Sequence, residues 1–312
     1  MTLLCYNIPV KVKVFAKLNL TLNVGAKQRN FHTIDSVVTS VDIFDIVEVV
    51  KRNDLRVKVS GVESVKQEHN TAYKAAVAFL RMFTATDSPI SGVDIFIQKG
   101  IPFGAGLGGS SADAAAVVYC MCKLFGVDIH SQKIHELCSS IGSDVNFMLL
   151  GGLGRLAGKG DDVTMYNLAQ PLYFALTTFD ESMSSGEIYS AFDALPHRGN
   201  GANQCSSVLA EPSATQTDEL LNLLQQGANG KAIKLLFNDL QQATLLVSNY
   251  AKRYLSFTQS NNLCCNMTGS GSAYYVACET HEQAQQVAQQ LNAHGFATKV
   301  CTSVPGGIID IH

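Results

Sequence analysis

The chain has 312 residues, enough for two domains or one large one, and its 46% apolar and 16% charged residues exclude a disordered chain. A net charge of −3 without any basic run argues against nucleic acid as a main partner. No stretch of about 18 uninterrupted apolar residues occurs, so we expect no membrane span.

The cysteines and the first residues bear on the cellular compartment. Nine cysteines occur without a CxxC pair, and their spacing does not suit a metal site. Residues 1–10 lack a charged segment ahead of an apolar core, which argues against a signal peptide. We therefore expect a cytoplasmic protein with buried, reduced thiols and no metal-ligating residues.

Residues 8–24 alternate between apolar and polar side chains, which predicts two strands or one bent strand. The alternation is interrupted at Phe15 and Ala16. Lys17 follows this break and lies on the same predicted face as Asn19. Taken alone, such a lysine is best explained as a solvated surface charge.

The next segments predict further strands and a first helix. Residues 25–30 are polar, and we expect a loop there. A strand should follow over 31–45, and residues 46–59 should form a hairpin. Residues 70–83 predict a helix, because their apolar side chains fall near one helical face.

A glycine-rich loop lies between a predicted strand at 92–98 and a predicted buried helix at 112–125. Glycines let the backbone approach an anion, and the helix N-terminus adds partial positive charge, so we favour phosphate binding over a plain turn. The spacing of Ser110 and Asp113 predicts a capping box at the helix start.

Two other phosphate-binding signatures fit this loop poorly. The GK[ST] signature of a P-loop is absent. A dinucleotide-binding loop is disfavoured because Pro102 separates strand from loop and because the acidic residue expected near position 125 is missing.

The middle of the chain contains a second glycine-rich stretch. Residues 131–141 predict a short helix with Gly142 as its C-cap. Asp144 follows, and an aspartate in this place ordinarily caps the N-terminus of the next segment. For residues 151–160 we expect turns between strands.

The second half mixes strands and helices. A third glycine-rich segment at 268–272 fits either another phosphate loop or an ordinary turn. The mixed order predicts an α+β protein with a boundary near residues 160–170. The remaining predicted elements are a strand at 172–179, a loop at 196–218, two helices within 220–254, a helix at 280–294 and a final strand at 297–301.

Three separated segments, 16–19, 102–115 and 268–272, together resemble the motifs of the GHMP small-molecule kinases. That family is named for galactokinase, homoserine kinase, mevalonate kinase and phosphomevalonate kinase. Further matches lie, in the same order along the chain, at residues 30–32, 70–76, 142–146 and 238–240.

The resemblance implies a two-domain fold and a phosphoryl transfer. A domain of the ribosomal-protein-S5-like type would span 1–165, and a ferredoxin-like domain 166–312. The γ-phosphoryl group of ATP would pass to a substrate hydroxyl, with Mg²⁺ bridging the phosphates. Asp144 would accept the hydroxyl proton, with Lys17 close to it. The implied nucleotide contacts are Asn70, Lys99, Pro102, Phe103, Gly104, Ala105, Gly106, Leu107, Gly108, Gly109, Ser110, Ser111 and Ala112.

Within the family, the motifs are most similar to the branch that phosphorylates the 2-hydroxyl of a cytidine-diphosphate-linked methylerythritol, in the non-mevalonate route to isoprenoids. This similarity implies that Phe31 and His32 hold the cytosine, that Tyr189 covers it, and that Asn19 belongs to the substrate site. Phe31 stands where the branch has tyrosine and Asn30 where it has glycine, and both changes bear on cytidine specificity.

Two alternatives stay open. One is a sibling GHMP kinase that acts on homoserine or a mevalonate-type alcohol, which a substrate panel would separate. The other is a ligand sensor with this fold and no catalysis. Intact Lys17, Asp144 and glycine loop argue against a sensor, since a pure binder needs no base. In each case we expect a small-molecule ligand and a monomer or homodimer.

Overall fold

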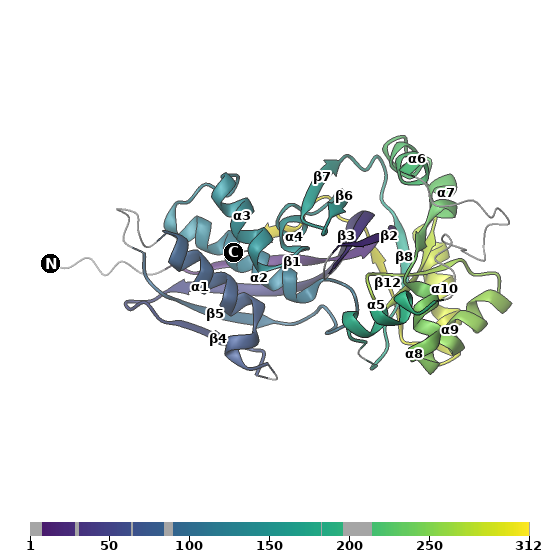
Figure 1. Ribbon diagram of the computed structural model, residues 1–312, viewed down its shortest axis with the longest axis horizontal. Coiled ribbons are helices and arrows are strands. Elements are labelled where there is room, and N and C mark those ends of the chain that lie inside the picture. Colours follow the sequence, from purple (N-terminus) through teal and green to yellow (C-terminus); the bar gives the residue numbers. More distant parts are fainter. Residues whose placement is uncertain are drawn as a thin grey trace.

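The computed structural model describes residues 8–28, 31–63, 65–83, 90–181, 183–195 and 214–311. Its strands and helices form two lobes, which Figure 1 shows side by side along the long axis. Both element types occur in each lobe, so the chain is an α+β protein. Among the described helices, none has the length and apolar character needed to cross a bilayer.

The first lobe is built on a nine-stranded sheet, as far as the described residues go. The long strand β3 pairs antiparallel with β1, β2, β5 and β6, and therefore connects most of the sheet. The strands of this sheet are β1 (Val10–Asn19), β2 (Thr21–Gln28), β3 (Phe31–Lys51), β4 (Val57–Ser60), β5 (Val93–Gln98), β6 (Leu153–Gly158), β7 (Asp162–Tyr166), β9 (Phe237–Asn238) and β13 (Ile308–Asp310).

Helices cover this sheet. Helix α2 packs across β1 and β3, and α1 and α4 pack against α2. Alanines and other apolar residues bury α2 on nearly all sides, as its sequence predicts. The helices of this layer are α1 (Thr71–Phe83), α2 (Gly109–Phe125), α3 (Gln132–Ile141) and α4 (Val145–Leu150), with the 3₁₀ turn η1 (Gln67–His69) before α1.

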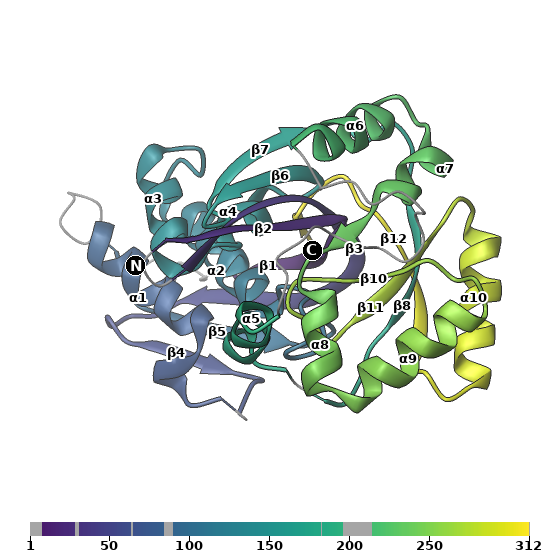
Figure 2. The ribbon, with the colours of Figure 1, turned by 45° about the vertical axis from the view of Figure 1, so that its right-hand side comes forward.

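The second lobe is built on an antiparallel sheet in the order β10-β11-β8-β12, which Figure 2 shows with α8, α9 and α10 around it. Its strands are β8 (Tyr173–Thr177), β10 (Cys265–Met267), β11 (Tyr274–Cys278) and β12 (Thr298–Thr302). Its helices are α5 (Ser185–Asp193), α6 (Ala214–Gln225), α7 (Asn229–Ala232), α8 (Gln241–Val247), α9 (Asn249–Ser260) and α10 (His281–Ala293), with the 3₁₀ turn η2 (Ile233–Leu235) after α7.

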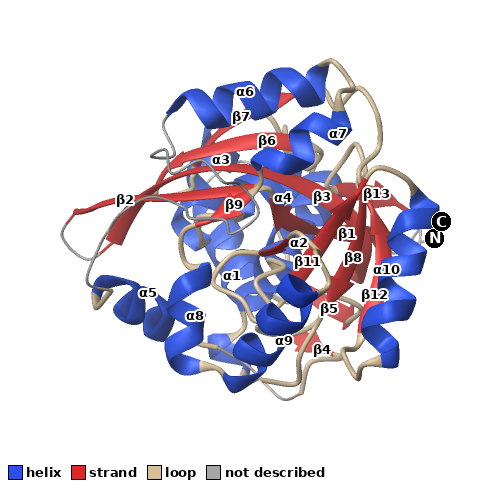
Figure 3. Cartoon of the chain, turned by 90° about the vertical axis from the view of Figure 1, so that its right-hand side faces the viewer, coloured by secondary structure: helices blue, strands red, loops and turns tan. Residues whose placement is uncertain are grey.

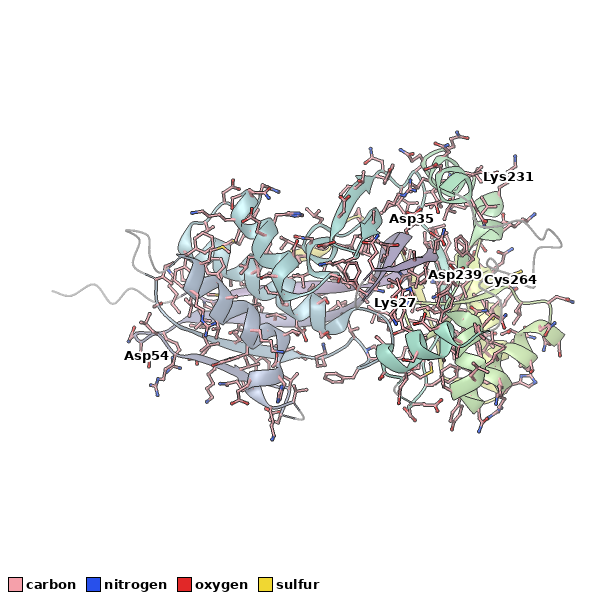
Figure 4. All side chains as sticks on the ribbon, in the orientation of Figure 1. Lys27, Asp35, Asp54, Lys231, Asp239 and Cys264 are labelled. Atoms are coloured by element: carbon pink, nitrogen blue, oxygen red, sulfur yellow. The ribbon has the colours of Figure 1, made fainter. Side chains whose placement is uncertain are left out.

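The two lobes share backbone pairing and an ion-pair network. Strand β9 pairs parallel with β2, and β13 pairs antiparallel with β1, so late segments complete the first sheet. Arg155 of β6 binds Asp35 of β3 and also reaches Asp218 of α6. Asp35 lies where the lobes meet in Figure 4. The arrangement brings residues far apart in sequence to the junction of the lobes.

Several predicted elements are confirmed. Strands at 92–98 and 172–179 correspond to β5 and β8, and helices at 70–83 and 280–294 to α1 and α10. Residues 8–24 form two strands rather than one bent strand, because β1 ends at Asn19 and β2 begins at Thr21. The pairing of β1 with β3 is irregular between Phe15 and Ala16, where the alternation breaks.

Other expectations for the first lobe are wrong. Residues 25–28 continue β2 rather than forming a loop, because backbone pairing with β3 does not require apolar side chains. The hairpin at 46–59 is absent, since β5 lies between β3 and β4. Residues 153–158 form β6 rather than turns; a side chain at Gly154 would press on the ring of Phe147, so glycine serves close packing there.

Expectations for the second lobe need similar corrections. Residues 220–254 contain several short elements instead of two helices, and Ser248 separates α8 from α9 by capping α9. Strand β12 is followed by β13, so it is not the last strand. Most of the predicted loop at 196–218 lies outside the described residues, and its end belongs to α6.

The cysteines only partly match the expectation of reduced thiols. Cys264, labelled in Figure 4, is disulfide-bonded, which corrects that expectation for this position. Burial raises the pKa of the other described thiols, which suits unreactive side chains. These free cysteines are Cys120, Cys122, Cys138, Cys265, Cys278 and Cys301.

Candidate active site

A cavity of about 710 Å³ lies between the lobes. Its walls come from β1–β3, the glycine loop, the start of α4, helix α5 and the segment 268–272. Figure 3 shows α5 beside α8 on the second-lobe side. The sequence-predicted residues in its lining are Lys17, Asn19, Phe31, His32, Lys99, Asp144, Tyr189 and all residues from 102 to 111.

The glycine loop is held between β1 and the segment 268–272. The N–H of Lys17 donates to the carbonyl oxygen of Leu107 at 3.1 Å. Gly106 and Gly108 have φ of 74° and 75°, values that strain other residues. A side chain at Gly106 would collide with the carbonyl of Thr268, and one at Gly108 would crowd Lys17. At these two glycines the loop therefore presents backbone to its surroundings.

The predicted capping box is wrong. Helix α2 begins at Gly109 with Gly108 as N-cap, and no side chain caps it. Asp113 instead binds Lys99 Nζ at 2.8 Å. A lysine ammonium competes better for a carboxylate than a backbone N–H does, because both partners are charged.

Lys17 and Asp144 form an ion pair in the cavity, with Lys17 Nζ 3.7 Å from Asp144 Oδ2. Lys17 is buried, so the solvated interpretation of its charge is wrong. Burial lowers its pKa, and the Asp144 carboxylate opposes that change. Asp144 occupies the N-cap position of α4 but caps no N–H with its side chain. That carboxylate is 30% exposed and stays available to a ligand.

Asn19 links this pair to the second lobe. Its Oδ1 accepts from Lys17 Nζ at 2.5 Å and from the N–H of Gly269 at 2.8 Å. Its Nδ2 donates to Ser36 Oγ at 2.8 Å. With both amide ends engaged by protein groups, Asn19 fixes the direction of the lysine side chain.

Two predicted nucleotide contacts, Asn70 and Ala112, are not part of the cavity lining. Asn70 Oδ1 accepts the N–H of Ala72 at 2.8 Å, so it caps the start of α1. Ala112 is fully buried inside α2. Contact of these two residues with a nucleotide stays a prediction. Lys99 does line the cavity, bound to Asp45 and Asp113.

An aromatic cluster forms the other end of the cavity. The rings of His32 and Tyr189 stack with centroids 5.4 Å apart and planes 19° apart. His32 Nδ1 lies 3.1 Å from the carbonyl oxygen of Gly25, and Nε2 lies 3.0 Å from Asp193 Oδ1 without hydrogen-bond alignment. Asp193 also binds Lys27 Nζ at 2.8 Å. Figure 4 shows Lys27 at the junction of the lobes.

Phe31 and Tyr189 border this end from different elements. Lys159 Nζ lies 4.7 Å from the centroid of the Phe31 ring. Burial raises the pKa of Tyr189 to about 12, and the charge of Asp144 adds to the effect, so its hydroxyl stays protonated. Asn30, the other departure from the motif, lies outside the described residues.

Sequence reasoning missed several lining residues, namely Lys27, Ser143, Lys159, Asp193 and Ser270. Asp193 follows Tyr189 by four residues on α5, so helical spacing could have found it. Lys27 was missed because residues 25–30 were predicted as a loop. In the structure Lys27 belongs to β2, where its backbone lies opposite His32 of β3.

Comparisons with known proteins agree with this geometry. Residues 70–152 match the model of the GHMP kinases N terminal domain. A protein of Caldicellulosiruptor saccharolyticus named 4-diphosphocytidyl-2-C-methyl-D-erythritol kinase is 31% identical over 284 residues, which cover 90% of this chain and 92% of that protein. A protein of the same name from Desulfitobacterium hafniense is 30% identical over 299 residues, which cover 93% of this chain and 95% of that one.

Solved structures share the fold. A 4-(cytidine 5'-diphospho)-2C-methyl-D-erythritol kinase aligns with a TM-score of 0.73 and 24% identity over 95% of this chain and 99% of that one. Homoserine kinase from Cytophaga hutchinsonii aligns with a TM-score of 0.75 and 16% identity over the whole of both chains. The fold alone does not separate these activities, whereas sequence identity over most of the chain does. The chain belongs to the GHMP kinase family, in the group of 4-diphosphocytidyl-2-C-methyl-D-erythritol kinases.

Proposed function

We propose that this chain transfers the γ-phosphoryl group of ATP to the 2-hydroxyl of 4-diphosphocytidyl-2-C-methyl-D-erythritol, a step toward isoprenoid precursors. The observation that carries the proposal is the placement of the Lys17–Asp144 pair between the glycine loop and the aromatic cluster of one cavity. We also propose the division into domains 1–165 and 166–312, and a monomer or homodimer.

The triphosphate would lie against the glycine loop. The N-terminus of α2 opens at Gly109, so unpaired backbone N–H groups and the helix dipole favour an anion there. Ser110 and Ser111, in the cavity lining, add hydroxyl donors. Lys99 supplies a cation beside the loop. These features would bind the negatively charged phosphates of any nucleoside triphosphate and do not distinguish its base.

The reaction would take place at Asp144 and Lys17. The substrate hydroxyl oxygen forms a bond to the γ-phosphorus while the bond to the β–γ bridging oxygen breaks, and ADP leaves. The hydroxyl proton passes to the Asp144 carboxylate. A carboxylate is a weak base, but a weak base suffices because the transition state of phosphoryl transfer is loose. Lys17, directed by Asn19, neutralises charge on the transferring group.

The cytosine would occupy the aromatic end. His32 and Tyr189 offer nearly parallel ring faces, and stacking on a base is worth about 1–3 kcal/mol. The Nε2 atom of His32 is buried without a hydrogen-bond partner in the described part of the chain, so a cytosine ring edge could supply one. Lys27 and Lys159 border the same end and suit the diphosphate of the substrate.

Mg²⁺ would enter with ATP. The described residues contain no group of three or more His, Cys, Asp or Glu side chains arranged to hold a metal ion. We expect the ion to be held mainly by the phosphates and by water, because Mg²⁺ usually keeps several waters and binds with substrate phosphates. Bound there, the ion would neutralise charge on the β- and γ-phosphates.

The test is an ADP-release assay with Mg-ATP and three acceptors, namely the cytidyl substrate, homoserine and mevalonate. We expect turnover with the cytidyl substrate alone. Turnover with another acceptor only would overturn the substrate assignment and leave the loop assignment standing. ATP binding without turnover on any acceptor would favour a ligand sensor.

A further inference from the structure

A buried cluster of three charged side chains lies beneath the glycine loop. Lys99 Nζ binds Asp45 Oδ2 and also Asp113 Oδ2, at 2.5 and 2.8 Å. Asp45 is fully buried, Asp113 is 6% exposed and the Lys99 side chain is 13% exposed. Burying charged groups is costly, so a cluster of this kind beside a ligand site calls for a role.

The cluster is attached to both ends of the glycine loop. Asp45 Oδ1 accepts the N–H groups of Gly100 and Ile101, at 2.7 and 2.8 Å, where the chain leaves β5. Asp113 lies in the first turns of α2, where the loop ends. Lys99 joins the two carboxylates and itself faces the cavity. A change in the cluster can therefore reach the loop from either side.

The charges of the cluster do not balance. Two carboxylates share one ammonium, and Asp113 Oδ1 is buried with no hydrogen-bond partner within the described ranges. The charged groups in contact with Asp113 are Lys99 and Asp45. Lys17 of β1 and Asp144 before α4 pair with each other on the cavity side. On α2 itself, Lys123 pairs with Asp310 at the far end of the helix.

We propose that Asp113 is a positioning residue for the nucleotide: it takes up a proton when phosphates enter the glycine loop, and its protonation releases Lys99 toward them. This proposal rests on the proposed binding of ATP to the loop. The proton comes from solvent and ends on the free Oδ1 of Asp113. Lys99 then keeps Asp45 as its single carboxylate partner and can share its ammonium with a phosphate oxygen.

The electrostatics support proton uptake. Burial raises the pKa of Asp113 to about 7, with Asp45 adding to the rise and Lys99 opposing it. The carboxyl is therefore partly protonated near neutral pH in the free protein. Phosphate charge at the loop disfavours a second carboxylate nearby and raises this pKa further, so binding and protonation reinforce each other.

The test measures protons taken up when the full chain binds Mg-ADP, without any cytidyl substrate. Calorimetric titrations at pH 7 in buffers of different ionisation enthalpy give that number. Wild type should take up about 0.5 proton more than Asp113→Asn, because the ligand's own titration is common to both. Between pH 6 and pH 8, the Kd for Mg-ADP should rise in both proteins, and the factor of the rise should be about 10 times larger for wild type than for Asp113→Asn.

Matched variants separate positioning from structure. Asp310→Asn removes the carboxylate that pairs with Lys123 of α2. This variant should take up as many protons on binding Mg-ADP as wild type does. Lys99→Met should lose the uptake, because Asp113 without its cation stays protonated; this variant also keeps the test valid if Asp113→Asn does not fold. If Asp113 had a purely structural role, Asp113→Asn would weaken ADP binding by the same factor at every pH.

Equal proton uptake by wild type and Asp113→Asn would overturn this proposal and leave the proposed function intact. Wild type that fails to bind Mg-ADP would refute both. A failed acceptor assay with normal, proton-linked ADP binding would refute the substrate assignment alone.

Discussion

The two ends of the cavity are built differently. The loop end, residues 102–111, is one continuous segment that presents backbone groups and the start of α2. The aromatic end, consisting of Phe31, His32, Tyr189 and Asp193, joins β3 of the first lobe to α5 of the second through side chains. A segment that binds through its backbone can be recognised locally, whereas a site made of distant side chains depends on the fold.

This difference fits the two ligands proposed. Phosphates are alike in every nucleotide, so N–H groups and a helix dipole suffice to bind them. A particular base must be distinguished by ring faces and hydrogen bonds from defined side chains. Substitutions at the two ends should therefore affect ATP and the cytidyl substrate separately, and a substitution between them should affect the chemical step.

The largest effect is expected for Asp144→Asn, between the two ends. Loss of the proton acceptor should lower kcat by about 10²- to 10⁴-fold, while binding of ATP and of CDP changes little. ADP release and calorimetry measure the two quantities. Asp162→Asn, on the exposed strand β7, is the control. A kcat close to wild type would contradict the base assignment.

Gly108→Ala should impair the loop end. The residue has a φ of 75°, and a methyl group there would crowd Lys17 and collide with Met148. A strain of about 1–3 kcal/mol should weaken ATP binding about 5- to 160-fold and leave CDP binding unchanged. Gly126→Ala is the matched control, because Gly126 has a φ of 68° with open space around it. If both variants lost ATP affinity equally, the loss would come from general backbone strain and not from the glycine loop.

Tyr189→Ala should impair the aromatic end. Loss of stacking worth about 1–3 kcal/mol should raise the KM for the cytidyl substrate by about 5- to 160-fold, with the KM for ATP unchanged. Tyr189→Phe keeps the ring and should behave like wild type. If the alanine variant affected ATP and the cytidyl substrate alike, the separation between the two ends would be wrong.

The smallest effect is expected for Asp193→Asn. The Asp193 and Lys27 side chains are 23% and 50% exposed, so solvent screens their pair. We expect the KM for the cytidyl substrate to rise about 2- to 5-fold, and less in high salt. Asp54→Asn removes a carboxylate from an ion-pair cluster far from the lobe junction in Figure 4 and should leave this KM unchanged. An effect that does not depend on salt would argue against a charge role.

Sequence reasoning was most successful where one segment makes its own structure. The order of strand, glycine loop and helix at 92–125 was predicted, because alternation, glycine content and an apolar helix are all local signals. Spacing was misleading where a distant group competes: Asp113 has the position of a capping partner, yet Lys99 binds it. The hairpin at 46–59 failed for a similar reason, since β5 takes the place beside β3.

The sequence by itself determined the α+β class, the kinase family through its ordered motifs, and the glycine loop. It could do so because glycines, helix starts and alternation act over a few residues. Only the tertiary structure decided that Lys17 is buried beside Asp144, that Asp193 reaches Lys27 and His32, and that Asp113 belongs to a charged cluster. Burial and electrostatic pairing depend on what packs against a side chain, and here the partners come from segments far away in the chain.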